Sequence, residues 1–417
     1  MVTMKRHYWT LLLFGYMLCG TARAGGIQIQ LVGHRQTGMA HTGTGLALDG
    51  SSVFTNPGAL AFVARPSVQF GAYVWRPRTQ FQAQTPVIYF SEMEPLLYSP
   101  IYVYASLRTR LSEQKQRWAF GIGINNPFLG GSDWPDDWKG KFITQEYGVN
   151  TLFIQPSVCR QINGELSVGV GIVYGVGTMI SRRAIQADGV NGTDASALFS
   201  GGGQGLGLNS GIYWQPHEHL SLGLSYRSPM HIRIENGKAT FVVPESLSSL
   251  YPEQSFSSQI YLPGVLNAGL GFKAEDRFLL ALDVNMTLWS RIDSVPIRLS
   301  KPVSGLFDYP ERNYINTFSF RAGGEYIVTE NLLIRGGVYY DGSPSPQGYV
   351  TPELPDSDRI GLTVGFSMTF WRALTLDCSY VHEFTGERSS LFEPAVFGGI
   401  YQSVSNMGGI GIKYSFK

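Results

Sequence analysis

The stretch RIGLTVGFSMTF, Arg359–Phe370, alternates strictly between apolar side chains and small or polar ones. The apolar positions are Ile360, Leu362, Val364, Phe366, Met368 and Phe370. A period of two residues predicts a β-strand with two different faces. The pattern continues beyond the roughly five or six residues usual for a strand of a soluble protein, and reaches the ~10 residues with which a tilted strand crosses a bilayer. We therefore expect the apolar face to contact lipid and the other face to line an enclosed interior.

The same alternation recurs along the rest of the chain, in about fourteen runs after residue 65. They centre on residues 67–83, 99–110, 117–128, 142–160, 165–181, 201–215, 219–235, 258–274, 277–290, 313–326, 331–342, 357–370, 373–385 and 406–416. Short turns between these runs alternate with long connections, which include residues 182–200, 236–257, 291–312 and 386–405. This asymmetry, with an even number of antiparallel strands, predicts an all-β outer-membrane barrel. The barrel must close because backbone N–H and C=O groups cannot remain unpaired in hydrocarbon.

The composition supports this class and excludes others. Of the 417 residues only 15% are charged, against about 25% in a typical soluble domain. The formal net charge of +1 lacks the basic excess of a nucleic-acid-binding protein. After residue 24 the sequence contains no run approaching the ~18 apolar residues of a membrane-spanning helix, so it predicts none.

Residues 1–24 are organised like a secretory signal peptide. Lys5 and Arg6 precede an apolar run that ends at Cys19, and the following Ala22-Arg23-Ala24 fits an A-x-A cleavage site. We expect cleavage after Ala24 and export of the mature chain to the bacterial outer membrane as a multi-pass barrel.

Residues 25–65 do not alternate like barrel strands. They are rich in glycine and contain SSVFTNPGALAFV, Ser51–Val63, in which an Asn-Pro-Gly break interrupts a half-apolar segment. A barrel of about fourteen strands has a bore wide enough to leak unless it is filled. We therefore expect residues 25–65 to form a hatch inside a barrel of residues 66–417. The alternative, a loose periplasmic leader, would leave Phe54, Leu60 and Phe62 exposed.

The sequence GMAHTGTGLALDGSSVFTNPGALAFV, residues 38–63, resembles the hatch of the FadL family of outer-membrane long-chain fatty-acid and hydrocarbon transporters. That family usually has Asn-Pro-Ala where this chain has Asn56, Pro57 and Gly58. Residues 222–234, 282–292 and 334–365 resemble strands of the same family, the last through its Tyr-Asp, Ser-Pro and Asp-Arg pairs. The resemblance covers essentially the whole mature chain.

The resemblance implies a monomeric fourteen-stranded barrel with an N-terminal hatch. It also implies a route for hydrophobic substrates: entry through a groove between long loops, a lumenal site beside the hatch, and lateral exit where the third strand kinks. The third run, WAFGIGINNPFLGG, stops alternating at Asn125, Asn126 and Pro127. Proline removes a ladder donor and belongs at sheet edges or bulges. The alternative is that the strand simply ends at Asn125 and a loop begins.

Two long connections contain clusters of apolar residues. The positions we expect to form the substrate groove are Phe199, Phe241, Val242, Val243, Leu247, Leu250 and Tyr251. Exposed apolar clusters of this size usually mark a binding surface. Alternatively, these side chains pack on one another and cap the barrel.

Three charged residues are expected inside the lumen. If Leu224 and Tyr226 face lipid, the alternation places Arg227 inside, and the same parity does so for Asp283 and Arg335. A charged side chain facing lipid near the midplane would cost about 2–4 kcal/mol. Such an arginine could bind a fatty-acid carboxylate through a charge-assisted hydrogen bond, or it could form a structural ladder with acidic groups of the wall or hatch.

No catalytic, metal or cofactor motif is recognisable. GGGQGLG, residues 201–207, resembles a phosphate-binding loop only superficially, because no Lys-Ser/Thr follows and it opens a strand. We therefore expect a non-enzymatic protein that passively takes up hydrophobic molecules, with long-chain fatty acids as the leading substrate. Its other contacts would be outer-membrane lipid and lipopolysaccharide, not nucleic acid. The alternative is a non-transporting adhesin or receptor that uses its long loops.

Overall fold

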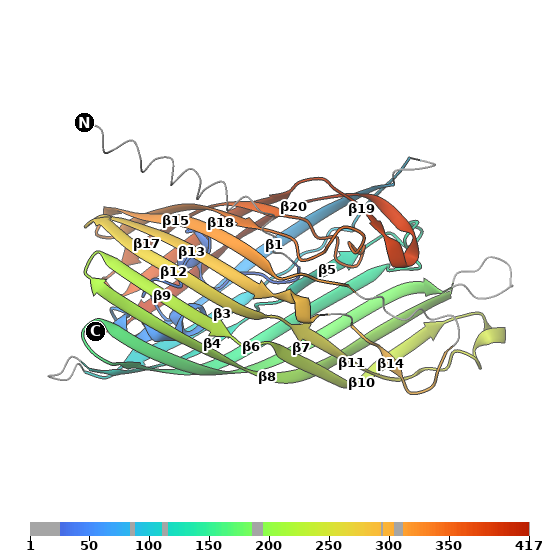
Figure 1. The fold of residues 1–417 in the computed structure, drawn as a ribbon, viewed down its shortest axis with the longest axis horizontal. Helices are drawn as coiled ribbons and strands as arrows, with labels where there is room; N and C mark the ends of the chain where they lie inside the picture. The colour runs from blue at the N-terminus through green and yellow to red at the C-terminus, as the bar shows by residue number, and fades with distance from the viewer. Residues whose placement is uncertain are drawn as a thin grey trace, which may run out of the picture.

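The computed structural model describes most of the chain after the predicted signal peptide, which lies outside the described residues. The described ranges are 26–83, 88–110, 116–185, 195–292, 295–303 and 312–416. Figure 1 shows a long barrel of tilted strands. Within the described ranges, no helix has the length and apolar character needed to cross a membrane.

Antiparallel strands pair in sequence around a ring that closes where β1 meets β20. The strand segments are β1 (Ser67–Ala83), β2 (Tyr89–Glu92), β3 (Ile101–Arg108), β4 (Trp118–Asn125), β5 (Leu129–Asp133), β6 (Glu146–Gln161), β7 (Leu166–Ile185), β8 (Ala195–His217), β9 (Leu220–Arg227), β10 (Met230–Val242), β11 (Gln254–Leu262), β12 (Gly264–Glu275), β13 (Phe278–Leu288), β14 (Arg298–Leu299), β15 (Thr317–Thr329), β16 (Leu332–Asp341), β17 (Arg359–Phe370), β18 (Leu374–Thr385), β19 (Arg388–Phe392) and β20 (Phe397–Ser415). Because several barrel strands consist of two segments, the barrel has fourteen strands, as the sequence predicted.

The two faces of each strand separate as the alternation predicts. On β17, Leu362 and Val364 are 51% and 57% exposed on the outer surface, whereas Thr363 between them is 3% exposed. The same division between exposed apolar and buried polar side chains continues on the neighbouring β16 and β18. The outer surface is therefore the apolar band that a bilayer requires.

The hatch fills the barrel near the end where the C-terminus lies, as the blue segment in Figure 1 shows. It consists of α2 (His34–Thr37), α3 (Ser52–Thr55) and the 3-10 helix η1 (Pro57–Phe62). Proline is favoured at a first helical position, and Pro57 starts η1. Val53 and Leu60 are buried against the wall. Three further 3-10 turns lie in the long connections: η2 (Glu245–Leu247), η3 (Trp289–Arg291) and η4 (Glu393–Ala395).

Some predicted boundaries were wrong. The third strand, expected over 117–128, is interrupted after Asn125, where β4 ends. The long connections are shorter than expected, because β8 already begins at Ala195, β10 continues to Val242 and β20 begins at Phe397. The β8 and β10 extensions pair with each other, with Val242 opposite Ser196. These extensions lie beyond the lipid-facing part of the strands, so their side chains no longer need to alternate. Their backbones nevertheless continue to pair.

Candidate functional site

The third barrel strand is broken between β4 and β5, and one side chain bridges the break. Asn126 Oδ1 accepts a hydrogen bond from the Ile101 backbone N–H at 3.1 Å, and its Nδ2 donates to the Thr151 carbonyl at 2.8 Å. Asn126 thus links the strands on both sides where the backbone ladder is missing. Asn125, the last residue of β4, is buried.

After the break, the third strand pairs with the start of the hatch in place of β3. The Ile29 N–H donates to the Pro127 carbonyl at 2.9 Å, and the Leu129 N–H donates to the Ile27 carbonyl at 3.0 Å. Gln28 and Phe128 form an antiparallel bridge. We call residues 26–31 the N-terminal segment. It covers a strand edge that would otherwise be unpaired inside the barrel.

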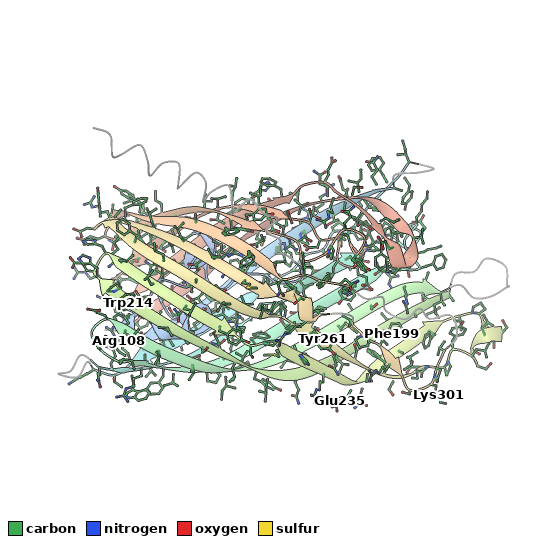
Figure 2. All side chains as sticks on the ribbon, viewed as in Figure 1. Arg108, Phe199, Trp214, Glu235, Tyr261 and Lys301 are labelled. Atoms are coloured by element: carbon green, nitrogen blue, oxygen red, sulfur yellow. The ribbon has the colours of Figure 1, made fainter. Side chains whose placement is uncertain are left out.

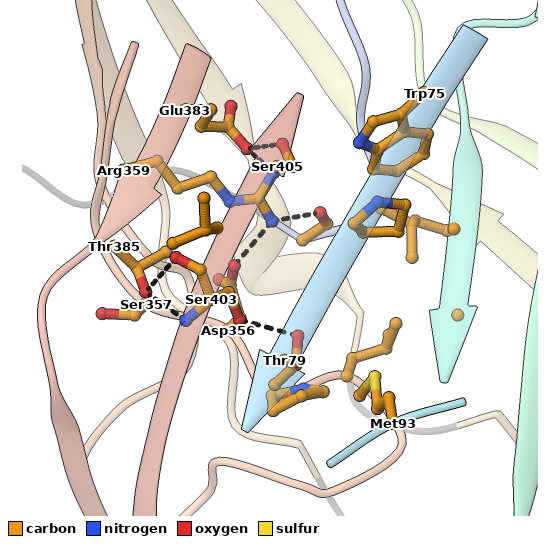
Figure 3. Close-up of a pocket in the computed structure, with 18 of the residues that line it drawn as sticks. Trp75, Thr79, Met93, Asp356, Ser357, Arg359, Glu383, Thr385, Ser403 and Ser405 are labelled. Carbon is orange, nitrogen blue, oxygen red and sulfur yellow. Dashed lines mark hydrogen bonds and ion pairs between the residues drawn. The ribbon is translucent and has the colours of Figure 1, made fainter. Parts of the chain in front are cut away.

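A cavity of ≈ 90 Å³ lies beside this junction, between the N-terminal segment, the broken strand and the opposite wall. Figure 3 shows Trp75 and Met93 on one side and Arg359 with Glu383 on the other. Arg359 donates to Asp356 and to the Gly26 carbonyl, both at 2.8 Å, and its Nη1 lies 3.9 Å from Glu383. The guanidinium therefore ties the hatch to the wall and has its charge compensated by carboxylates.

A second, smaller cavity of ≈ 30 Å³ lies on the other side of Gly26 and Ile27. Its remaining lining is largely aromatic and aliphatic: Tyr147, Ile260, Tyr261, Trp289, Ile292, Val295, Tyr314 and Leu354, with Arg312. Arg312 donates to Glu353 at 2.6 Å and to the Tyr314 hydroxyl at 3.1 Å, and it is buried. The larger cavity thus has a mixed polar and apolar lining and the smaller one a mainly apolar lining, and the arginine in each is already ion-paired.

The three charged residues predicted to face the lumen are all buried. They contact the hatch or the residues that anchor it, and they do not line these two cavities. Arg335 donates to Glu325 at 2.6 Å and lies 3.5 Å from Asp377. Asp283 accepts from the backbone N–H groups of two hatch residues, Gly43 and Thr44, at 2.9 Å each. These contacts match the structural ladder more closely than a carboxylate-binding site.

Arg227 has no acidic partner among the described residues. Its guanidinium lies 3.4 Å from the centre of the Phe54 ring and donates to the Phe54 carbonyl at 2.8 Å. A desolvated cation over an aromatic face is stabilised by the ring quadrupole. Arg227 therefore also fixes the hatch.

The hatch motif joins the hatch to the wall through close backbone contacts. Asn56 donates to the carbonyls of Thr44 at 2.8 Å and Ile212 at 3.0 Å, and its side-chain oxygen accepts from the Gly58 N–H. A Cβ atom at Gly58 would lie 2.7 Å from the Gly211 carbonyl oxygen. This close approach favours glycine after Pro57.

The apolar loop residues expected to form the substrate groove differ in their exposure. Phe199 is buried and packs edge-on against Phe241 and Phe256, with ring centres 6.2 and 5.6 Å apart, and Tyr251 contacts Phe241. Val243 also packs against this core, and Leu247 is half-buried. Val242 and Leu250 are 67% and 63% exposed. The cluster is thus divided between a packed interior and an exposed rim.

Arg312 and the pairing of the N-terminal segment were not identified from the sequence. Arg359 lies in the Asp-Arg pair that carried the family resemblance, but its contact with Gly26 joins residues far apart in the chain. The pairing partner of residues 27–29 could not be read from alternation, because the segment has no strand-like pattern. Among the described residues, no group of three or more metal-ligating side chains is placed to bind a metal ion.

The barrel, its internal hatch and the interrupted strand define a plugged outer-membrane transport barrel. The chain belongs to the family described as outer membrane protein transport protein (OMPP1/FadL/TodX), whose model matches residues 15–405. This family transports hydrophobic compounds across the outer membrane.

Relatives with known names and structures agree with this family. The chain is 23% identical to the 47 kDa outer membrane protein of Pasteurella multocida, covering 96% of each chain, and 21% identical to the long-chain fatty acid transport protein of Escherichia coli, covering 87% of each. A FadL homologue from Pseudomonas aeruginosa superposes with a TM-score of 0.81 at 18% identity, over 94% of this chain and 100% of the homologue. The toluene transporter TodX of Pseudomonas putida gives 0.65 at 14%, over 95% and 99%.

Proposed function

We propose that this protein passively transports small hydrophobic molecules inward, from the loops through the lumenal cavities beside the hatch to a lateral exit at the broken third strand. The observation that carries the proposal is the junction at Pro127. There the barrel wall lacks its β3 pairing, the N-terminal segment covers the free edge, and a cavity lies directly alongside. Displacing residues 27–29 would open that edge toward the bilayer without unfolding the barrel.

Transfer of an apolar chain from water into such a path is favourable by about 0.8 kcal/mol per methylene group. The exposed loop residues Val242 and Leu250 offer a first apolar contact, and the Trp289 and Tyr314 cavity a second. The final step releases the molecule into the bilayer. Diffusion down this gradient needs no coupled energy source, and the sequence has no nucleotide-binding motif.

Long-chain fatty acids are the leading substrate in this proposal, and the name of the Escherichia coli relative supports them. One observation favours uncharged hydrocarbons as a second class. Arg312 and Arg359, the arginines that line the two cavities, are already paired with Glu353 and Asp356. A carboxylate head group would have to compete with those partners, whereas a hydrocarbon would not. The toluene transporters among the structural relatives fit that second class.

Repairing the broken strand tests the route. In cells that lack other transporters for these compounds, we would measure uptake of labelled oleate and of labelled toluene with the double variant Asn126→Thr, Pro127→Val. It restores a ladder donor at 127 and removes the bridging amide. We expect uptake of the transported compound to fall severalfold or more while the amount of folded barrel is unchanged.

Gly386→Ala is the matched control, because a Cβ atom at that position meets nothing within 4 Å. It should transport like the parent. Unchanged uptake by the repaired variant would reject lateral exit at Pro127. If neither compound is taken up by the parent, but the cells gain loop-dependent surface adhesion, the adhesin or receptor alternative replaces transport.

A further inference from the structure

A groove of ≈ 950 Å³ runs along the outer surface of the barrel, between β8 and β10. It lies outside the transport path, on the wall that faces lipid. Its lining residues are Tyr174, Val176, Gly202, Gly203, Gln204, Gly205, Leu206, Pro229, His231, Arg233, Glu235 and Asn236. The glycine-rich stretch 201–207, which has no role in phosphate-loop chemistry, forms much of its floor.

The groove exists because the seventh barrel strand is broken between β9 and β10. After the break, the side chains of Met230 and Ile232 are buried against Gly175 and Gly177 of β7. The start of β10 therefore leans into the lumen. A Cβ atom at Gly203 would overlap the backbone carbonyl of Arg233, so glycine is required where β10 passes close to β8. The inward lean of β10 leaves a depression on the outside.

The groove reaches the outer edge of the apolar band. Trp214 lies near the short-turn end of β8, and Gln204 is ten residues further along that strand. At about 3.3 Å per residue and a strand tilt of about 40°, their heights differ by about 25 Å, the height of the apolar band itself. Tyr174, which donates to Gln204 at 2.5 Å, is an aromatic residue of the kind found at that boundary. Figure 2 shows Trp214 near one end of the barrel and Glu235 farther along its length.

The chemistry of the groove changes from one side to the other. Leu206, which is 69% exposed, and Val176 provide an apolar floor on β8 and β7. His231, Arg233 and Glu235 follow one another along the exposed face of β10. Among the described residues, Arg233 has no acidic partner within ion-pair distance. The groove thus places a guanidinium that makes no ion pair among the described residues beside a surface that suits an acyl chain.

A second groove on the outer wall, of ≈ 590 Å³, provides a comparison. It is lined by apolar side chains and small residues: Leu220, Leu270, Phe272, Leu280, Ala281, Leu282, Ala322, Gly323 and Gly336. Such a groove suits lipid tails alone. Of these two grooves, the one between β8 and β10 combines an apolar floor with a cation at the level of the head groups, and the other does not.

We propose that the groove between β8 and β10 is a binding site for a phosphorylated acyl lipid of the outer leaflet, which in this membrane is lipopolysaccharide. An acyl chain lies along Leu206 and Val176, and a phosphate group accepts hydrogen bonds from Arg233. Guanidinium groups match the geometry of phosphate and are weakly hydrated, which favours this pairing at a membrane surface. Glu235 repels the anion and confines it to the Arg233 end of the groove.

The test measures lipid retained by the full-length barrel purified from outer membranes in a mild non-ionic detergent. Bound lipid A and its phosphate are quantified by mass spectrometry per mole of folded protein. We expect Arg233→Gln to retain roughly tenfold less, since a hydrogen bond to a charged group is lost. Glu235→Gln should retain more than the parent. Gly202→Leu should also lose lipid, because it fills the floor while leaving every charge in place. Its Cβ atom would lie an ordinary 3.5 Å from the nearest atom, the Gly177 carbonyl oxygen.

Two variants outside the groove are the matched controls. Arg76→Gln removes an exposed arginine of β1, and Gly408→Leu adds a side chain to a glycine of β20 whose Cβ would be 3.5 Å from Tyr380. Both should retain lipid like the parent. The proposal is overturned if the parent retains only detergent or unphosphorylated lipid, or if Arg76→Gln lowers retention as much as Arg233→Gln. Should Arg233→Gln fail to fold, Gly202→Leu and Glu235→Gln still decide, because they predict opposite changes.

Discussion

The body of the hatch and its N-terminal segment are attached to the barrel in different ways. The body is held by buried charges: Arg35 of α2 donates to Glu325 at 2.9 and 2.6 Å, and Glu325 is shared with Arg335. The N-terminal segment is held mainly by backbone hydrogen bonds to residues 127–129 and by the contact of Arg359 with Gly26. Breaking a buried ion-pair network costs far more than exchanging backbone hydrogen bonds with water.

The two kinds of attachment indicate which part of the hatch can move at a low cost in free energy. The hatch body can serve as a fixed plug, while the N-terminal segment can leave the broken strand at a much smaller free-energy cost. Ile27 and Ile29, whose backbones pair with the break, are buried apolar residues, and Ile27 lines both cavities. A hydrophobic substrate could replace part of the contact they lose.

The largest expected effect comes from breaking the anchor of the hatch body. Arg335→Ala leaves the carboxylates of Glu325 and Asp377 buried with fewer partners, and should lower the free energy of unfolding by about 3–5 kcal/mol. Thermal unfolding followed by heat-modifiable migration on gels would measure it. Arg78→Ala, which removes an exposed ion pair with Glu92, should unfold like the parent. Equal stability of both variants would contradict the role assigned to the anchor.

Acidification tests the link between the two regions, because His41 Nδ1 hydrogen-bonds the Gln30 carbonyl at 2.9 Å. Burial, assisted by the nearby Arg321, lowers the pKa of His41 from 6.5 to about 3. The unfolded chain therefore binds a proton more readily, so stability is full above pH 6.5 and falls as the pH drops toward 3. At pH 5 the loss from His41 is about 2 kcal/mol.

The measurement is the unfolding temperature of the parent and of His41→Gln between pH 7 and pH 5. The parent should lose stability over this range, and the variant should lose less. Parallel curves would show that the pKa of His41 is the same in the folded and the unfolded chain, so that its burial in the hatch contributes nothing to the pH dependence.

A smaller effect is expected where the hatch motif touches the wall. Gly58→Ala forces a methyl group to within 2.7 Å of the Gly211 carbonyl oxygen and should cost about 1–3 kcal/mol by overpacking. Thermal unfolding against Gly386→Ala, which adds the same methyl group in open space, measures it. A Gly58→Ala variant as stable as the control would mean that the hatch shifts to accommodate alanine.

The smallest expected change in stability is at the broken strand. Asn126→Ala leaves the Ile101 N–H without its acceptor and should cost about 1–2 kcal/mol. Hydrogen exchange should show a local increase at Ile101, Phe128 and Leu129, with the body of the hatch unchanged. Faster exchange throughout the hatch would show that its two regions are coupled and not separately attached.

Most of the arrangement of the barrel wall could be predicted from the sequence. Alternation such as Ile360 to Phe370 identified the lipid-facing side chains, and it placed Arg227 and Asp283 in the lumen by parity alone. The environment of the apolar residues Phe199 and Tyr251 was harder to predict, because an apolar side chain in a long connection suits both a packed cap and an exposed surface. The ends of the extracellular strands were also missed, since pairing outside the bilayer does not require one apolar face.

Alternation in the sequence predicted which residues face lipid and how many strands cross the membrane, and the lack of alternation in residues 25–65 led us to expect a hatch there. Local side-chain patterns suffice there because the bilayer imposes the same requirement on every strand. Which groups neutralise the lumenal arginines, and the pairing of residues 27–29 with the broken strand, became clear only from the folded arrangement. Several of these contacts join positions a hundred or more residues apart, such as Arg35 and Glu325, and depend on the closure of the barrel around the hatch.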